Sequence, residues 1–145
     1  MLARPFRSDR NKRTDCGRVA QLPDHHLRLV CAAGQREFGE NKVQEALQKI
    51  AQSTDTRLRW HLIGHLQSNK AKKAAAAVHA IHAVDSVELL KKVDQAAAAA
   101  QRTIDVLVQV DLALEETKFG APEDEVPSIF AAAAECRSAR LTGLM

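Results

Sequence analysis

The stretch REFGENKVQEALQKI, residues 36–50, joins a short strand to an amphipathic helix. Residues 36–39 are long enough for one short strand, and Glu40 and Asn41 place an acid and an amide at its tip. Behind them, apolar side chains recur at helical spacing: Val43, Ala46, Leu47 and Ile50. A strand that runs directly into a helix is the unit of parallel α/β sheets, and such junctions are where these proteins bind ligands.

The same unit recurs along the chain. Apolar runs predict strands at 36–39, 58–64, 80–84, 104–110 and 140–145. Helices are predicted at 23–33, 41–52, 69–78 and 122–137, and a further helix begins after Ser86, a good N-cap. The strand tips follow one another at 21 to 34 residues, which fits a doubly wound sheet or a (β/α)8 barrel. Polar residues at successive tips favour a ligand site at the carboxyl ends of the strands.

Charge is distributed unevenly over the 145 residues. Residues 1–18 hold six basic and two acidic side chains, a local charge of +4, whereas the remainder holds 15 basic and 16 acidic side chains, or −1. We therefore predict a basic, disordered leader over 1–22 and one folded domain over 23–145. No basic face is evident on the folded part, so nucleic acid is not an expected partner.

The remaining composition indicates a globular, cytoplasmic protein. Hydrophobic residues make up 46% and charged residues 27% of the chain, and no apolar run is long enough for a membrane span. Cys16, Cys31 and Cys136 are odd in number and widely spaced, without a CxxC pair. This pattern predicts reduced thiols rather than a disulfide framework or a zinc site.

Few side chains form a motif that carries chemistry by itself. His61 and His65 stand four apart, but they fall on a predicted strand and its turn, so packing is favoured over metal ligation. No glycine-rich phosphate cradle and no nucleophile motif is present, so no catalytic residue is assigned. Glu115 and Lys118, in the loop after the best strand, fit a functional pair and a plain surface ion pair equally well.

Taken together, the strand tips resemble one family. The segments FGEN, WHLIGHLQSNK, VDS, QVDLALEETKFG and LTGLM, in this order, are similar to the pyridoxal-phosphate homeostasis proteins, from about Pro23 to Met145. The resemblance implies a (β/α)8 barrel like the N-terminal domain of alanine racemase, and a bound pyridoxal 5′-phosphate. It implies a role in vitamin B6 homeostasis, with no firmly assigned reaction. Asn41 matches the amide of the family's GEN motif, and Lys118 matches a lysine on the cofactor side.

Two departures from the family affect what is expected of this chain. Ala20 stands where the family has its Schiff-base lysine, three residues before Pro23, and alanine has no amine to condense with an aldehyde. Up to Met145 the chain matches only about strands 2 to 6 of the barrel, without the family's later phosphate-binding turns. We therefore expect a partial (β/α)8 barrel from a truncated or frameshifted gene, with weak or absent cofactor binding.

These expectations leave two functions open. The chain is either a pyridoxal-phosphate-binding homeostasis protein or a degenerate, cofactor-free fragment that binds a partner as a half-barrel. Open barrel edges make self-association a further possibility. A racemase or decarboxylase is disfavoured, because the nucleophilic lysine and a second domain are lacking.

Overall fold

The computed structural model describes residues 17–18, 24–53, 57–112 and 119–145. Six parallel strands form one sheet in the order β1-β2-β3-β4-β5-β8. Their bounds are Gly17–Arg18 (β1), Glu37–Glu40 (β2), Arg59–Leu62 (β3), Ala80–Val84 (β4), Ile104–Val108 (β5) and Ala139–Leu144 (β8). Each strand pairs with the strand next to it in the chain, apart from a small two-stranded sheet between β5 and β8. This order is that of a (β/α)8 barrel, of which the chain forms a part.

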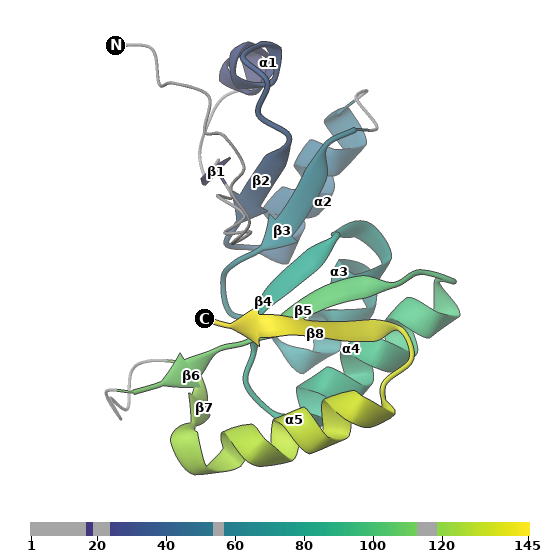
Figure 1. Ribbon diagram of the computed structural model, residues 1–145. Coiled ribbons are helices and arrows are strands. Elements are labelled where there is room, and N and C mark those ends of the chain that lie inside the picture. Colours follow the sequence, from purple (N-terminus) through teal and green to yellow (C-terminus); the bar gives the residue numbers. More distant parts are fainter. Residues whose placement is uncertain (1–16, 19–23, 54–56, 113–118) are drawn as a thin grey trace.

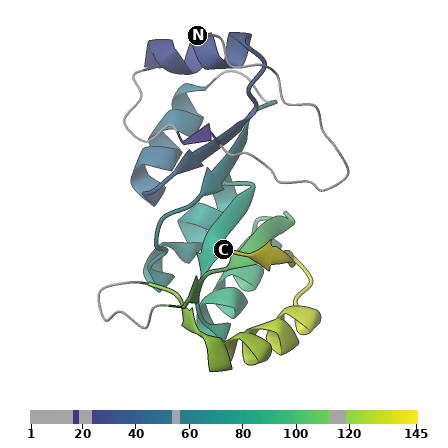
Figure 2. The same ribbon diagram turned by 60° about the vertical axis from the view of Figure 1, so that its left-hand side comes forward.

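The helices join consecutive strands, and α2 to α5 cover one face of the sheet (Figures 1 and 2). They are α1 (Asp24–Ala32), α2 (Val43–Gln52), α3 (Ala71–Ala77), α4 (Val87–Ala99) and α5 (Val126–Glu135). Single 3-10 turns, Ser68–Lys70 (η1) and Glu123–Glu125 (η2), precede α3 and α5. Ser86 caps α4 as expected, its Oγ accepting a hydrogen bond from the Leu89 N–H at 3.2 Å. In the described part of the chain, every helix is too short or too polar to cross a bilayer.

Side-chain alternation decides which face of the sheet the helices cover. In β5, Ile104, Val106 and Val108 are buried in the common core, whereas Asp105 and Leu107 between them are only partly buried. Successive side chains of a strand point to opposite faces, so the helix-covered face is apolar and the other face can carry polar groups. The predicted βα order of the chain is confirmed.

The connection after β5 differs from the predicted one at two places. The predicted strand at 104–110 ends at Val108, and Val110–Asp111 (β6) pairs instead with Ala121–Pro122 (β7) in the second sheet. Gln109 lies between the two strands β5 and β6, and its carbonyl accepts a hydrogen bond from the Ala121 N–H at 2.7 Å. Helix α5 starts at Val126 rather than at residue 122, because the acidic residues before it form the 3-10 turn η2.

Two residues of the predicted leader lie in the sheet. Gly17 pairs with Phe38 and Arg18 with Gly39, which makes β1 a parallel neighbour of β2. The sequence predicted no strand here, because strand pairing uses backbone groups that leave no periodic pattern over only two residues. The rest of residues 1–23 lies outside the described residues, so disorder of the leader remains a prediction.

Glu40, at the tip of β2, is a structural residue. Its side chain is fully buried, and Oε1 lies 2.5 Å from Nζ of Lys49 on α2. Its other oxygen, Oε2, has no hydrogen-bond partner within the part of the chain that the structure describes. The pair joins the strand to the helix that follows it, and removal of one partner would leave a buried charge uncompensated.

Asp94 on α4 holds the start of β8. Its Oδ1 accepts three backbone hydrogen bonds, from the N–H groups of Arg137 (3.0 Å), Ser138 (2.7 Å) and Ala139 (2.7 Å). These N–H groups follow the end of α5 and would otherwise lack a helical or strand partner. One carboxylate therefore fixes the position at which the chain turns back into the sheet.

We predict that Asp94→Ala lowers the free energy of unfolding by about 1–3 kcal/mol, because three N–H groups lose a charged acceptor. Urea denaturation followed by circular dichroism measures this. The matched control is Glu88→Ala on the same helix, where the carboxylate is exposed and pairs with Lys92. The assignment is wrong if the two variants unfold at the same urea concentration.

Candidate functional site

The carboxyl ends of the strands bring together side chains from four connections. Asn41 follows β2, His65 follows β3, Asp85 follows β4, and Phe119 belongs to the connection between β6 and β7. Asn41 is partly buried, and its amide has no hydrogen-bond partner among the described residues. An amide in this position is available to a ligand.

Gly64 fixes the position of Asn41. A Cβ atom at Gly64 would lie 2.1 Å from the Asn41 carbonyl oxygen and 2.8 Å from its Cα. The β3 connection therefore packs directly on the backbone at the tip of β2, and only glycine allows this approach. The same junction is supported by the Ile63 N–H, which donates to the Glu40 carbonyl at 2.8 Å.

An aromatic pair lies beside this junction. The rings of His65 and Phe119 stack with centroids 3.7 Å apart and an interplanar angle of 13°. His65 Nδ1 lies 3.8 Å from Asp85 Oδ2, and Gln109 Nε2 donates to the Phe119 carbonyl at 2.7 Å. Phe119 is 55% exposed, so one aromatic face at the carboxyl ends of the strands, called the mouth of the sheet below, is accessible to solvent.

A hydrogen-bonded row of three side chains, Glu37, His61 and His82, crosses β2, β3 and β4 on the face of the sheet that the helices do not cover; it is called the histidine column below. His61, 5% exposed, contacts the Glu37 carboxylate through Nε2, and its Nδ1 lies 2.9 Å from His82 Nε2. In the neutral pair, Nε2 of His61 donates to the carboxylate, so Nδ1 accepts from His82. Burial, and secondarily the neighbouring His61, lowers the pKa of His82 to about 4. His82 is therefore uncharged at neutral pH.

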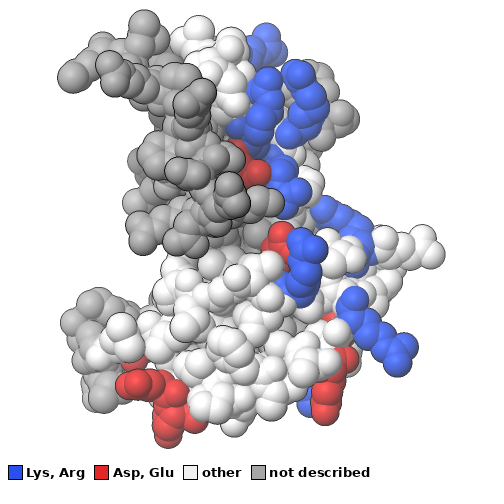
Figure 3. Space-filling model, viewed as in Figure 1, with Lys and Arg blue, Asp and Glu red and all other residues white. Residues whose placement is uncertain are grey.

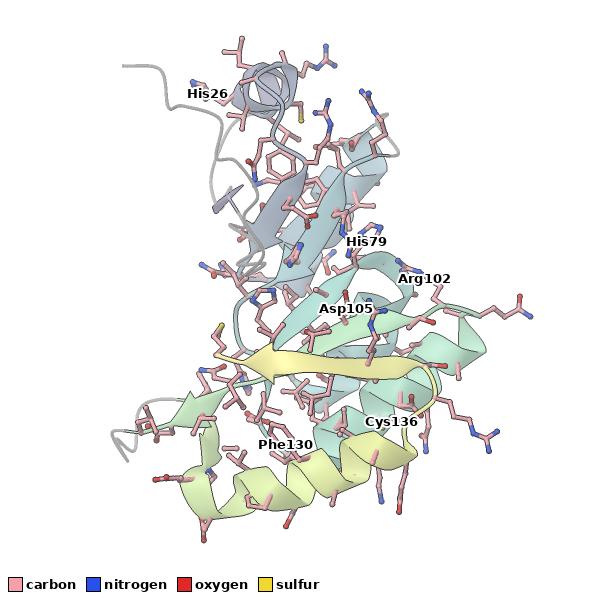
Figure 4. All side chains as sticks on the ribbon, in the orientation of Figure 1. His26, His79, Arg102, Asp105, Phe130 and Cys136 are labelled. Atoms are coloured by element: carbon pink, nitrogen blue, oxygen red, sulfur yellow. The ribbon has the colours of Figure 1, made fainter. Side chains whose placement is uncertain are left out.

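Arginine and carboxylate side chains alternate below this column, toward the amino ends of the strands. Arg59 Nε lies 3.2 Å from Glu37 Oε1, and an Arg59 Nη lies 3.6 Å from Asp105 Oδ2. Arg140 binds the other Asp105 oxygen at 2.6 Å. Figure 4 shows Asp105 in the sheet, with His79 and Arg102 near its amino edge. Glu37, Arg59 and Asp105, together with His61 and His82, contribute to the lining of a cavity of about 580 Å³.

The structure separates the two histidines that the sequence placed four apart. His61 belongs to the interior column and His65 to the mouth, and each has its own carboxylate, Glu37 and Asp85. No group of three or more histidine, cysteine or carboxylate side chains in the described ranges is arranged to hold a metal ion. His79 has a packing role, since its Nδ1 accepts the Trp60 N–H at 3.1 Å.

Three residues on which the sequence-based predictions depend lie outside the described residues. These are Lys118, its possible partner Glu115, and Ala20 at the position of the family lysine.

The sequence also did not predict that Glu37, His82, Asp105 and Arg140 belong to one network. In the sequence these residues are polar side chains at alternate positions of otherwise apolar strands. That alternation does not show which residue of a neighbouring strand each one contacts.

The chain belongs to the family of the alanine racemase N-terminal domain, whose sequence pattern matches residues 24–145. Within this family its relatives are the pyridoxal phosphate homeostasis proteins. The protein of that name from Pseudomonas aeruginosa is 36% identical over 123 residues, and the one from Escherichia coli is 38% identical over 116 residues. These matches cover 85% and 78% of this chain but 54% and 50% of the relatives, so the chain spans about half their length.

A solved structure has the same fold. PipY of Synechococcus elongatus, determined without PLP, matches with a TM-score of 0.84 at 37% identity, covering 88% of this chain and 60% of PipY. PipY with PLP bound matches with a TM-score of 0.82 over 90% of this chain. The expected family and the partial barrel are confirmed.

We predict that Gly64→Ala destabilises the fold by about 3 kcal/mol or more, because the added methyl group overlaps the Asn41 backbone. Thermal and urea denaturation measure this. Gly143→Ala is the matched control, since the nearest atom to its Cβ, Leu107 Cδ2, lies 4.0 Å away. Equal stability of the two variants would contradict the close approach at Gly64.

The lowered pKa of His82 predicts a dependence of stability on pH. The unfolded chain binds this proton with the ordinary pKa of 6.5, whereas the folded protein binds it only near pH 4. The free energy of unfolding therefore falls as the pH drops from about 6.5 to about 4, and this contribution levels off below that. His79, whose pKa is also lowered, mainly by burial and then by Arg102, acts in the same direction.

His82→Asn removes the His82 contribution, so its difference in stability from the unmodified protein should change across this pH window and be constant above it. Urea denaturation at a series of pH values measures the difference. A difference that does not vary with pH would show that His82 titrates alike in the folded and unfolded chain.

Proposed function

We propose that this protein acts in intracellular pyridoxal-phosphate homeostasis and binds pyridoxal phosphate at the carboxyl ends of its strands. The observation that carries the proposal is the Asn41 amide, which has no hydrogen-bond partner among the described residues and follows the tip of β2, where Gly64 packs on its backbone. The fold around it is shared with PipY, whose structure with PLP bound is 37% identical to this chain. Cytoplasmic location and the absence of a nucleic-acid partner are parts of the same proposal.

The described residues fit a non-covalent contact with this cofactor. Asn41 offers a donor and an acceptor, and the exposed face of Phe119, stacked on His65, suits a planar ring. Bound pyridoxal phosphate supplies an aldehyde that reacts with primary amines. Among the described residues that line the interior cavity there is no lysine, and its one arginine, Arg59, carries a guanidinium group, which does not take part in that reaction.

Covalent attachment would therefore depend on a lysine elsewhere. Lys118 matches the family's cofactor-side lysine, and Lys12 is a second candidate in the basic leader. We propose Lys118 as the first residue to test. Catalysis is not part of the proposal, because no general acid or base has been placed against a reacting atom.

Equilibrium dialysis against pyridoxal phosphate tests the proposal. We expect saturable binding that Asn41→Ala weakens about three- to tenfold, the cost of one hydrogen bond. Asn69→Ala, an exposed amide in η1, is the matched control and should bind as the unmodified protein does. Absence of saturable binding would overturn the proposal in favour of a cofactor-free, partner-binding half-barrel.

Borohydride reduction followed by peptide mapping tests attachment separately. A pyridoxyl group on Lys118, lost in Lys118→Ala, would identify a covalent site. Binding without any reduced adduct would show that the cofactor is held by non-covalent contacts alone.

A further inference from the structure

Each of the helices α1 to α5 leads into a strand of the main sheet through a connection that carries one basic residue. The connections, 33–36, 53–58, 78–79, 100–103 and 136–138, hold in turn Arg36, Arg57, His79, Arg102 and Arg137. Their described residues include no acid and no lysine. Because parallel strands all begin on the same side of a sheet, these basic residues lie in one row, called the arginine rim below.

Backbone carbonyls at the ends of helices explain part of this row. Arg36 Nη1 donates to the Cys31 carbonyl of α1 at 2.7 Å, and Arg102 Nη1 donates to the Ala75 carbonyl of α3 at 3.3 Å. The carboxyl end of a helix carries the negative end of its dipole, so a guanidinium group is favoured there. A guanidinium group has five N–H donors, so both arginines keep further donors for a ligand.

The carboxylates near the rim leave it an excess of positive charge. Glu37 and Asp105, at the amino ends of β2 and β5, are paired with Arg59 and Arg140 on the sheet. Glu135, the last residue of α5, is an exposed carboxylate beside the rim. One exposed carboxylate is fewer than the arginines of the four connections, so the rim can attract an anion.

Three guanidinium groups of the rim have no carboxylate partner in the described part of the chain. Arg36, Arg102 and Arg137 form no ion pair there, and Arg137 is exposed. Burial, and then Arg102 and Arg59, lower the pKa of His79 between them, as a positive potential requires. Figure 3 shows basic side chains gathered along the side of the molecule on which the strands begin.

The chemistry of the rim favours carboxylates of a protein over nucleic acid. Guanidinium groups bind a carboxylate through two parallel hydrogen bonds, and clusters of arginine are a common means of recognising acidic segments. Proteins that bind single-stranded nucleic acid add aromatic side chains on which bases stack. Phe38 and Trp60, the aromatic residues of β2 and β3, are buried, and the described residues of the five connections include no Phe, Tyr or Trp.

We propose that the arginine rim binds an extended acidic segment of a partner protein. Neighbouring strands lie about 4.8 Å apart, so the five connections span about 19 Å. An extended chain rises about 3.3 Å per residue, so a run of about six residues reaches from the first connection to the last. Alternate side chains of such a segment point to the same side, where they meet the guanidinium groups.

The rim lies at the opposite end of the strands from the proposed cofactor site, so one molecule can hold both ligands. Its basic residues are 21 to 35 positions apart along the chain, and for this reason no basic cluster is visible in the sequence. The parallel order of the strands brings them together.

Fluorescence anisotropy of dye-labelled octaglutamate, titrated with the full chain, tests the proposal. We expect saturable binding that is lost at high salt, because salt screens exposed charges. Arg57→Glu and Arg137→Glu, in the second and the fifth connection, should each weaken binding about five- to tenfold. Lys70→Glu is the matched control, because Lys70 is exposed in η1 at the carboxyl ends of the strands, and it should leave binding unchanged.

A conservative variant tests the guanidinium geometry. Arg137→Lys keeps the charge and loses the planar fork, so it should weaken binding less than Arg137→Glu does, by about twofold. Circular dichroism verifies that each variant is folded.

Four results would overturn the proposal. Octaglutamate might not bind, or it might bind both rim variants as tightly as the unmodified chain, which would assign the binding to the basic leader. A loss in only one rim variant would contradict a segment that lies along the whole rim. An octamer of deoxythymidylate that binds as tightly as octaglutamate would identify a nucleic-acid surface instead. Pyridoxal-phosphate binding is measured separately, so its failure would leave these results unaffected.

Discussion

Burial of one face of the parallel sheet against α2 to α5 is the constraint on which the rest of the structure depends. Phe38, Trp60, Leu62, Ile81 and Val106 are almost fully inaccessible on that face. Because side chains alternate along a strand, every residue buried toward the helices leaves its neighbour on the opposite face. The helix-free face is therefore where polar and charged residues can be placed without disrupting the core.

The charged groups on that face are tolerated because each has a partner on another strand. Glu37 contacts His61 and Arg59, and Asp105 contacts Arg59 and Arg140. Partly buried charges cost free energy unless such pairs offset it. Among the described residues of the cavity, the one arginine, Arg59, is already paired with the carboxylates of Glu37 and Asp105. The proposed contacts with pyridoxal phosphate are therefore placed at the carboxyl ends of the strands, where Asn41, His65 and Phe119 lie.

The proposed cofactor site lies at one end of this architecture. Cofactor binding depends on the carboxyl ends of β2 and β3, where Gly64 holds the Asn41 backbone.

The sequence alone determined the order of strands and helices, the carboxyl-end location of Asn41 and Gly64, and the family, because each depends on local periodicity or on short motifs. Only the tertiary structure decided that His61 contacts Glu37 and His82, residues 24 and 21 positions away. It alone placed Glu40 against Lys49 in the core, and Asp94 on the N–H groups at the start of β8. Strand register and helix packing set these contacts, and neither leaves a trace in the spacing of residues along the chain.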